Sequence, residues 1–443
     1  MSNELTGYRG EALSLLKKAN ASIGKQIRIT RNGETYEGIL IPRSEYGDEK
    51  HILVKLKSGY NIGIKVASNM KVEVTGVGAK PAFTRPPAPA AKEELPKVAV
   101  VSTGGTIASK VDYRTGAVEP ALTAEDLYAI VPELSDLAKV KAHVLFSELS
   151  ENLTPKHWSE IAYAVAKQIE EGASGVVVAH GTDTLGYTAA ALSFALQNLP
   201  VPVVLVGAQR SSDRPSSDAA LNLAGAVAVA AESDLAEVVA VMHEKTGDEV
   251  VAVHRGTKVR KCHTSNRDAF KSINMQPLAH YNVLEKTFEM TGENYRQRDP
   301  SRKMVVKPTF NEKATLIKFH PGSVPELIDW YVEKGYRGIV LEGTGLGHVG
   351  RTYNAPIKRA VEKGVVVGMT SQCIWGKVHM TVYYTGRDLL ALGVLQLEDM
   401  LAETALVKMM WALGQTENPE EAKKIMLTNL AGEFSERRIP QER

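Results

Sequence analysis

The chain has 443 residues, of which 44% are hydrophobic and 23% are charged, and its formal net charge is +2. This is the composition of a globular protein with two or three domains, and the near-neutral charge provides no global attraction for nucleic acid or a membrane surface. The two cysteines, Cys262 and Cys373, form no C-x-x-C pair, which argues against a zinc site or a disulfide framework.

The start of the chain, Met1–Leu5, lacks a basic region followed by an apolar core, so it does not resemble a signal peptide. The apolar stretches are shorter than the roughly 18–20 residues that a membrane helix needs. We therefore predict a cytoplasmic protein without a membrane-spanning segment.

Residues 1–76 predict an N-terminal helix followed by a small all-β barrel. Residues 1–20 carry apolar side chains at helical spacing, and five short strands follow, the first two joined by the hairpin turn Asn32-Gly33. The predicted strands are Gln26–Thr30, Tyr36–Ile41, Ile52–Leu56, Tyr60–Val66 and Lys71–Val74. Residues 1–75 contain 12 Lys and Arg against 8 Asp and Glu. An RNA-facing module is one interpretation, and a docking or spacer module is the favoured one.

Residues 77–96 form the predicted linker between this module and the rest of the chain. Its prolines are Pro81, Pro86, Pro87, Pro89 and Pro96. Because proline stiffens the backbone and cannot donate to a β ladder, the segment predicts a semi-rigid tether.

Beyond the linker, apolar strands alternate with helices, which is typical of a doubly wound parallel sheet. We predict a larger α/β domain over residues 97–305 and a smaller one over residues 306–443. The larger domain has predicted strands at 98–102, 143–146, 176–179, 203–207 and 238–242, and helices at 123–133, 155–171, 184–197 and 217–231. The smaller domain has predicted strands at 316–319, 338–341 and 365–369, and helices at 324–334, 354–363, 398–413 and 419–426. Residues 293–307 are polar and predict a connection.

Two of these strands run into glycine-containing loops that carry threonines. Strand 98–102 leads into Thr103–Ala108 (TGGTIA), and strand 176–179 leads into His180–Thr184 (HGTDT). Ligands of open α/β sheets bind beyond the carboxyl ends of the strands, so the loops are candidates for a nucleophile and its support.

The residues of these loops favour acyl transfer over nucleotide binding. A phosphate-binding P-loop needs a lysine beside Ser or Thr after its last glycine, whereas Gly105 is followed by Thr106 and Ile107. Threonine needs a base, and Asp183 can orient a lysine for that task. Backbone N–H groups of glycine turns are natural oxyanion donors. The alternative is that Gly104-Gly105 only makes a tight turn. The residues alone do not identify which lysine would act as the base.

Two histidines raise the question of a metal. His180 and His243 have no clustered partners at ligand spacing, so we expect structural histidines and no metal site.

The two loops resemble the signature motifs of the L-asparaginase/glutaminase family, in the family's order and over roughly residues 97–430. The resemblance implies an asparaginase-like two-domain core, and it implies that Thr106 and Thr182 are the catalytic threonines. Of the two, Thr106 is implied to be the nucleophile, and attack by Thr182 is the alternative that the sequence leaves open. Asp183 is implied to orient the lysine, which precedes an Asp-Ala-Phe segment in the family. Here Lys261 precedes Asp268-Ala269-Phe270 and is the match. Lys258, three residues earlier, is the alternative; otherwise it would be a solvated strand residue.

The same resemblance implies three substrate-binding residues. Ser150 matches the serine of the family's Ser-Gln pair, and Glu151 stands where the family has glutamine. Glu151 could favour a substrate ammonium group or merely cap the helix near Pro155. Tyr113 is the candidate lid tyrosine, although it follows Thr106 by only seven residues, or it is a surface tyrosine.

The barrel and linker add a resemblance to the D-subunit (GatD) family of archaeal glutamyl-tRNA(Gln) amidotransferases, which the segments Ser102–Pro120 and Gly207–Asp213 share. Members release ammonia from Gln or Asn for a partner E subunit (GatE), which uses ATP to amidate Glu-tRNA(Gln). The resemblance implies no cofactor in this chain, ATP and Mg²⁺ at the partner, and a homodimer within a heterotetramer. A free-standing asparaginase/glutaminase and a non-enzymatic RNA-binding protein are the alternatives.

Overall fold

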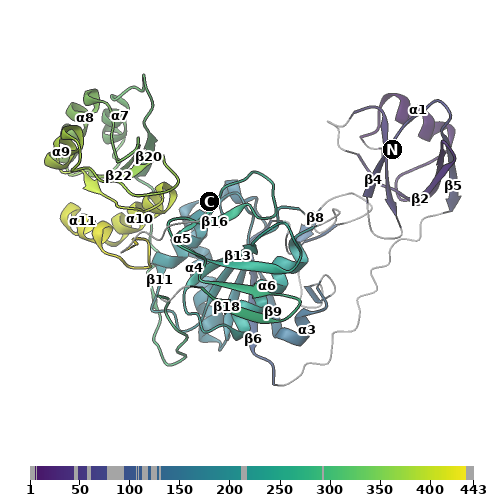
Figure 1. Cartoon of the computed structure of the whole chain (residues 1–443), viewed down its shortest axis with the longest axis horizontal. Helices are drawn as coiled ribbons and strands as arrows, with labels where there is room; N and C mark the ends of the chain where they lie inside the picture. The colour runs from purple at the N-terminus through teal and green to yellow at the C-terminus, as the bar shows by residue number, and fades with distance from the viewer. Residues whose placement is uncertain are drawn as a thin grey trace.

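The computed structural model describes residues 5, 7–43, 48–56, 61–76, 94–105, 107, 109–111, 118–120, 127–128, 131–210, 217–291 and 294–435 (Figure 1). The predicted linker therefore lies mostly outside the described residues, as does most of the predicted helix 123–133.

In its described residues, the N-terminal module has a five-stranded antiparallel sheet and one helix, α1 (Gly10–Lys18). Its sheet has the order β4-β3-β2-β1-β5, with β1 Gln26–Arg31, β2 Glu34–Leu40, β3 His51–Leu56, β4 Asn61–Lys65 and β5 Lys71–Gly76. Asn32 and Gly33 both have positive φ, as a two-residue hairpin turn requires. Leu16 of α1 packs with Ile27 and Ile52 in a core formed by this module's own residues.

The central domain is built on an eight-stranded sheet with the order β18-β17-β14-β13-β12-β10-β6-β9. Five strands are parallel: β6 Lys97–Ser102, β9 Lys139–Val144, β10 Gly175–Ala179, β12 Val203–Val206 and β13 Val238–His243. After β6 the chain turns to one side to add β9, and it then crosses back to add β10 on the other. The topological switch point, where such sheets bind ligands, therefore lies between β6 and β10.

Three strands extend this sheet in antiparallel fashion and were not predicted: β14 Val250–Arg255, β17 Ala279–Asn282 and β18 Thr287–Met290. The connection between β13 and β14 is too short for the crossover that a parallel neighbour requires, so β14 returns antiparallel. The described residues of the domain also form three small strand pairs: β15 (Val259–Lys261) with β16 (Phe270–Ser272), β7 (Ser109–Val111) with β8 (Val118–Pro120), and β11 (Leu196–Gln197) with β19 (Val305–Val306).

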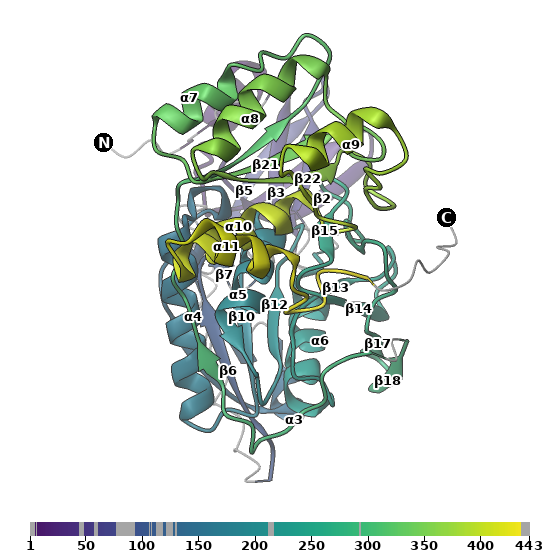
Figure 2. The same cartoon turned by 90° about the vertical axis from the view of Figure 1, so that its left-hand side faces the viewer.

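Helices cover both faces of the central sheet. On one face lie α4 (Pro155–Glu170) and α5 (Leu185–Ala195), and on the other lie α3 (Leu134–Leu137) and α6 (Ala219–Glu232), as Figure 2 shows for α4 and α6. Successive residues of β10 enter opposite cores, Val177 beneath α6 and Val178 beneath α4 and α5. Because both faces are buried, the strands are continuously apolar, as the sequence predicted.

The C-terminal domain has a four-stranded parallel sheet, with β20 Ala314–Lys318, β21 Gly338–Gly343, β22 Val366–Ser371 and β23 Leu395–Gln396. Its helices are α7 Leu327–Glu333, α8 Asn354–Glu362, α9 Tyr384–Ala391, α10 Ala402–Gln415 and α11 Pro419–Leu427. Two short 3₁₀ helices, η1 (Ser150–Asn152) and η2 (Arg351–Tyr353), lie one in each domain. The two-residue β23 and the helix α9 were not predicted.

Helix α10 lies between the two α/β domains (Figures 1 and 2). Trp411 of α10 stacks on Phe194 of α5 with ring centroids 5.9 Å apart, and Trp158 of α4 joins the same cluster. Helix α5 is thus covered by the sheet on one side and by α10 on the other, which explains why it is apolar all round. Among the described helices, none is long and apolar enough to cross a membrane.

Candidate active site

The two predicted threonine loops lie side by side at the switch point. Strands β6 and β10 pair in register with Ser102 beside Ala179, and the loops follow these residues directly. The backbone N–H and the hydroxyl of Thr103 each donate to the carbonyl of Ala179 at 3.0 Å. A Cβ on Gly105 would lie 2.7 Å from the backbone nitrogen of Gly181, and Gly105 has φ +77°. The loops therefore touch through backbone, and this contact requires glycine at position 105.

Strand β15 brings Lys261 to the second loop. Its Nζ lies 2.9 Å from Oγ1 of Thr182 and 2.7 Å from Oδ1 of Asp183. In the register of the β15–β16 hairpin, Lys261 stands opposite Phe270, which is buried in the core beneath α5 together with Ala269. The hairpin therefore fixes the strand that carries the lysine. An amine at this distance can donate to the hydroxyl oxygen when charged or accept the hydroxyl proton when neutral.

The alternative lysine, Lys258, is directed elsewhere. Its side chain is buried, and Nζ lies 2.7 Å from Oδ2 of Asp399 in the C-terminal domain. Burial lowers the pKa of Lys258, and the neighbouring Asp399 carboxylate opposes that shift. The expectation that Lys258 is a solvated strand residue is therefore wrong, and of the two lysines it is Lys261 that lies beside Thr182.

Ser150 lies against the second loop. It is buried in η1, and a Cβ on Gly181 would be 2.9 Å from its Oγ. The hydroxyl of Thr184 donates to the backbone carbonyl of Ser150 at 2.7 Å. The neighbouring Glu151 is exposed.

The interpretation of Glu151 as a helix cap is wrong. Thr154 is the N-cap of α4, and it forms a capping box with His157, whose Nδ1 accepts the backbone N–H of Thr154 at 3.0 Å.

Two predicted site residues, Thr106 and Tyr113, lie outside the described residues. The chain neighbours of Thr106 are both described. Gly105 is in contact with the second loop, and Ile107 is fully buried in the core beneath α6.

The two histidines are held by protein groups. His180 is buried, with Nδ1 2.6 Å from the carbonyl of Gly181 and Nε2 2.9 Å from the hydroxyl of Thr188. Burial lowers the pKa of His180 to about 4, so this side chain is neutral near pH 7. Nδ1 of His243 lies 2.6 Å from Oδ1 of Asn222. Within the described part of the chain, no group of three or more His, Cys, Asp and Glu residues is placed to hold a metal ion.

A third loop, which follows β12, supports Thr182 and was not predicted. A Cβ on Gly207 would lie 2.7 Å from Cγ2 of Thr182 and 3.0 Å from the carbonyl of His180. The threonine methyl therefore rests against this glycine while the hydroxyl faces Lys261. One sequence signal could have identified this loop. Gly207 directly follows a buried strand, and the two threonine loops also follow buried strands.

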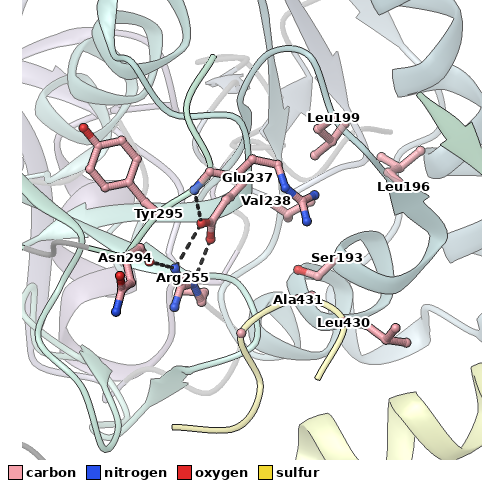
Figure 3. A pocket seen from close by; sticks show the side chains of 12 residues that line it. Ser193, Leu196, Leu199, Glu237, Val238, Arg255, Asn294, Tyr295, Leu430 and Ala431 are labelled. Atoms are coloured by element: carbon pink, nitrogen blue, oxygen red, sulfur yellow. Dashed lines mark hydrogen bonds and ion pairs between the residues drawn. The ribbon is translucent and has the colours of Figure 1, made fainter. Parts of the chain in front are cut away.

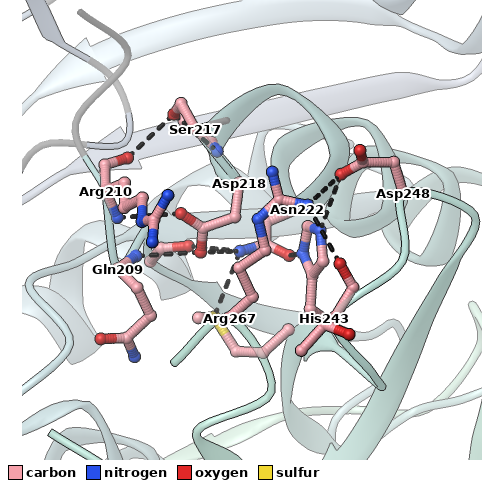
Figure 4. Close-up of polar contacts among 12 residues, drawn as sticks. Gln209, Arg210, Ser217, Asp218, Asn222, His243, Asp248 and Arg267 are labelled. Atoms are coloured by element: carbon pink, nitrogen blue, oxygen red, sulfur yellow. Dashed lines mark hydrogen bonds and ion pairs between the residues drawn. The ribbon is translucent and has the colours of Figure 1, made fainter. Parts of the chain in front are cut away.

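Buried polar side chains at the N-terminal end of α6 hold this third loop in place (Figure 4). The carboxylate of Asp218, fully buried, accepts the backbone N–H groups of Gln209 and Arg210 at 2.9 Å each, and the Asn222 amide at 3.0 Å. The same amide donates to the carbonyl of Gly207 at 3.0 Å. A buried carboxylate with three donors is strongly stabilised, so the backbone next to Thr182 has little freedom to move.

Family comparisons cover most of the chain. The family "Asparaginase, N-terminal" matches residues 97–294, "Glutaminase/Asparaginase C-terminal domain" matches residues 313–426, and "GatD N-terminal domain" matches residues 21–75. Among solved structures, the thermostable L-asparaginase of Thermococcus kodakarensis is 32% identical with a TM-score of 0.68, and the similarity covers 76% of this chain and 99% of that one. L-asparaginase I of Vibrio cholerae is 30% identical with a TM-score of 0.67, covering 77% and 99%.

Curated relatives match over nearly the whole length. The glutamyl-tRNA(Gln) amidotransferase D subunit of Metallosphaera sedula is 50% identical over 98% of this chain and 97% of its own. The protein of the same name from Pyrococcus abyssi is 52% identical over 95% and 96%. The asparaginase structures account for the two α/β domains, whereas these relatives also include the N-terminal module. The chain therefore belongs to the asparaginase family and, within it, to the family of glutamyl-tRNA(Gln) amidotransferase D subunits.

Proposed function

We propose that this chain is the amidase subunit of a tRNA-dependent amidotransferase, releasing ammonia from the side-chain amide of glutamine or asparagine. The observation that carries the proposal is the contact of Lys261 with Thr182 and Asp183 at the switch point of the central sheet. This arrangement provides a hydroxyl, a proton acceptor and an orienting carboxylate in one loop cluster.

In the proposed reaction, a threonine hydroxyl attacks the carboxamide carbon of the substrate. Thr106 is our first candidate for the nucleophile, on the basis of the family resemblance, and Thr182 is the second. As the C–O bond forms, Lys261 accepts the hydroxyl proton and Asp183 stabilises the ammonium that results. The proton then passes to the amide nitrogen, which leaves as ammonia, and water hydrolyses the threonyl ester to release glutamate or aspartate.

The substrate's α-groups are assigned to three further residues. Ser150, buried beside Gly181, is assigned to the α-carboxylate on the basis of the family resemblance. Glu151, exposed next to it, would favour the α-ammonium group. Tyr113 is proposed as the lid tyrosine from the family resemblance alone.

We further propose that the ammonia is used by a GatE-type partner, which binds ATP and Mg²⁺ and amidates Glu-tRNA(Gln). The match of residues 21–75 to the GatD N-terminal domain supports this assignment over a free-standing asparaginase, as does the name shared by the near-full-length relatives. In this proposal the chain acts in the cytoplasm, as a homodimer within a heterotetramer, and holds no cofactor of its own.

The test is ammonia release from L-glutamine and L-asparagine by the full chain, with and without the partner subunit and Glu-tRNA(Gln). We expect weak turnover by the chain alone and stimulation by the partner and its tRNA, and we expect Thr106→Ala to abolish turnover. Full activity in Thr106→Ala would refute Thr106 as the nucleophile. Fast turnover that ignores the partner and the tRNA would instead support a free-standing asparaginase.

A further inference from the structure

The segment Arg255–Lys261 ends in the lysine strand β15, which pairs with β16, and residues of the C-terminal domain also bond to it. Thr257 is bonded twice: its hydroxyl donates to the carbonyl of Ala431 at 3.0 Å, and its own carbonyl accepts the hydroxyl of Thr404 at 2.9 Å. Arg260 pairs with Glu403 at 3.1 Å. These contacts join the strand of Lys261 to α10 and to the tail that follows α11.

The tail also covers the beginning of the segment, as Figure 3 shows. Arg255 forms a two-point ion pair with Glu237, with distances of 2.7 and 3.0 Å. Gly432 lies directly against Arg255, since a Cβ there would be 2.8 Å from the guanidinium. A cavity of about 180 Å³ lies at this junction, lined by Ser193, Glu237, Arg255 and Ala431 among others. The tail and the central domain thus share one interface at the start of the segment.

A buried ion pair between Lys258 and Asp399 joins the segment to the C-terminal domain. The two side chains are 1% and 6% exposed, and Nζ lies 2.7 Å from Oδ2. The other carboxylate oxygen of Asp399 accepts the backbone N–H of Ser435 at 2.9 Å. On the other side, the carbonyl of Lys258 accepts the N–H of Ile273, one residue beyond β16. Leaving either buried charge without its partner would cost free energy. The pair therefore favours the one relative position of the two domains in which Lys258 and Asp399 stay in contact.

We propose that the Lys258–Asp399 pair is a positioning contact through which the C-terminal domain holds Lys261 at hydrogen-bond distance from Thr182. Lys258 does not touch the reacting groups; it acts through the three-residue strand β15 that begins directly after it. The inference rests on the proposed amidase function, since it assigns a role in that reaction to a pair outside the loop cluster.

The test compares single and double substitutions at the pair in the full chain, with ammonia release from L-asparagine and L-glutamine as the readout. Lys258→Met and Asp399→Asn should each lower kcat about 10- to 100-fold, because a displacement of about 1 Å at a catalytic group has an effect of this size. KM should change by no more than about twofold, since neither side chain touches substrate. The double variant should be no worse than the poorer single variant, because it leaves no unpaired buried charge.

Lys408→Met is the matched control. Lys408 and Glu433 form an equally buried pair, 2.6 Å apart and both 0% exposed, which links α10 to the tail. The tail reaches the segment of Lys261 through Ala431 and Thr257, whereas Lys408 bonds to Glu433 and to the carbonyls of Met426 and Thr428. This variant should lower the Tm as Lys258→Met does while keeping kcat within about threefold of wild type. If Lys408→Met loses as much kcat as Lys258→Met, the loss in Lys258→Met results from general destabilisation, and the positioning role is overturned.

Two further outcomes separate this inference from the proposed function. If the wild-type chain releases ammonia and Lys261→Met does not, but Lys258→Met and Asp399→Asn keep wild-type kcat, the positioning role alone is overturned. If the wild-type chain and its partner release no ammonia from either amide, the amidase function fails, and the inference fails with it.

Discussion

Replacing Gly207 with alanine tests whether the loop after β12 sets the position of Thr182. Gly207 has no positive φ, so alanine is compatible with its backbone and the added methyl group is the whole perturbation. That methyl would lie 2.7 Å from Cγ2 of Thr182 and 3.0 Å from the carbonyl of His180. The loop cannot retreat freely, because Asp218 and Asn222 bond to its backbone.

The size of the effect follows from these distances. Carbon atoms pack at about 3.5–4.0 Å, so the threonine side chain must move by about 1 Å. The contact between its hydroxyl and Nζ of Lys261, now 2.9 Å, would lengthen beyond a hydrogen bond. A shift of this size at a catalytic group costs about 10²-fold in kcat. Overpacking should also lower the free energy of unfolding by about 1–3 kcal/mol.

The assay is steady-state ammonia release from L-asparagine and L-glutamine, with the unfolding free energy measured in urea. Gly247→Ala is the control, because Gly247 lies in the β13–β14 connection and a methyl group added there would have no atom within 4 Å. We expect Gly247→Ala to keep wild-type kcat. Wild-type kcat in Gly207→Ala would refute the reasoning that the third loop supports Thr182.

Three further predictions concern the lysine, a histidine and the domain junction. Lys261→Met should lower kcat about 10²- to 10⁴-fold in the ammonia assay, because it removes the proposed proton acceptor. Proton uptake by His180 in the unfolded state should lower the free energy of unfolding by about 2 kcal/mol between pH 7 and pH 5, as measured by urea titration. The pKa of His180 is about 4 in the folded chain, against about 6.5 unfolded, so only the unfolded state takes up the proton in this range. Trp411→Ala should lower the unfolding free energy by about 3–5 kcal/mol, because it empties the contact between α10 and α5.

Each of these has its own control. Lys245→Met removes an exposed lysine in the β13–β14 connection and should leave kcat unchanged, whereas equal losses in both variants would contradict the role of Lys261. His180→Gln should show a smaller loss of stability between pH 7 and pH 5 than wild type, and an identical loss would contradict the assignment. Trp375→Ala, at a half-exposed tryptophan, should cost far less than Trp411→Ala. Equal costs would show that the junction contributes little to stability.

The sequence determined the local elements and the two loops. Continuous apolar strands between helices predict a parallel sheet buried on both faces, and this signal depends only on residues close in the chain. The hairpin turn at Asn32-Gly33 and the loop glycines at positions 104 and 105 were also identifiable from local sequence. A backbone with positive φ favours asparagine and glycine. Strands β14, β17 and β18 were missed, because turns and the β15–β16 hairpin connect them instead of helices, and this pattern is weaker than a strand–helix repeat.

The tertiary structure decided which residues meet. Lys258 and Lys261 are both lysines of one short segment, and the family resemblance rather than the residues themselves distinguished them. Only the fold directs one toward Asp399, 141 positions away, and the other toward Thr182, 79 positions away. Contacts at such separations depend on the order of the strands and the packing of two domains. Local periodicity, which acts over a few residues, cannot determine them.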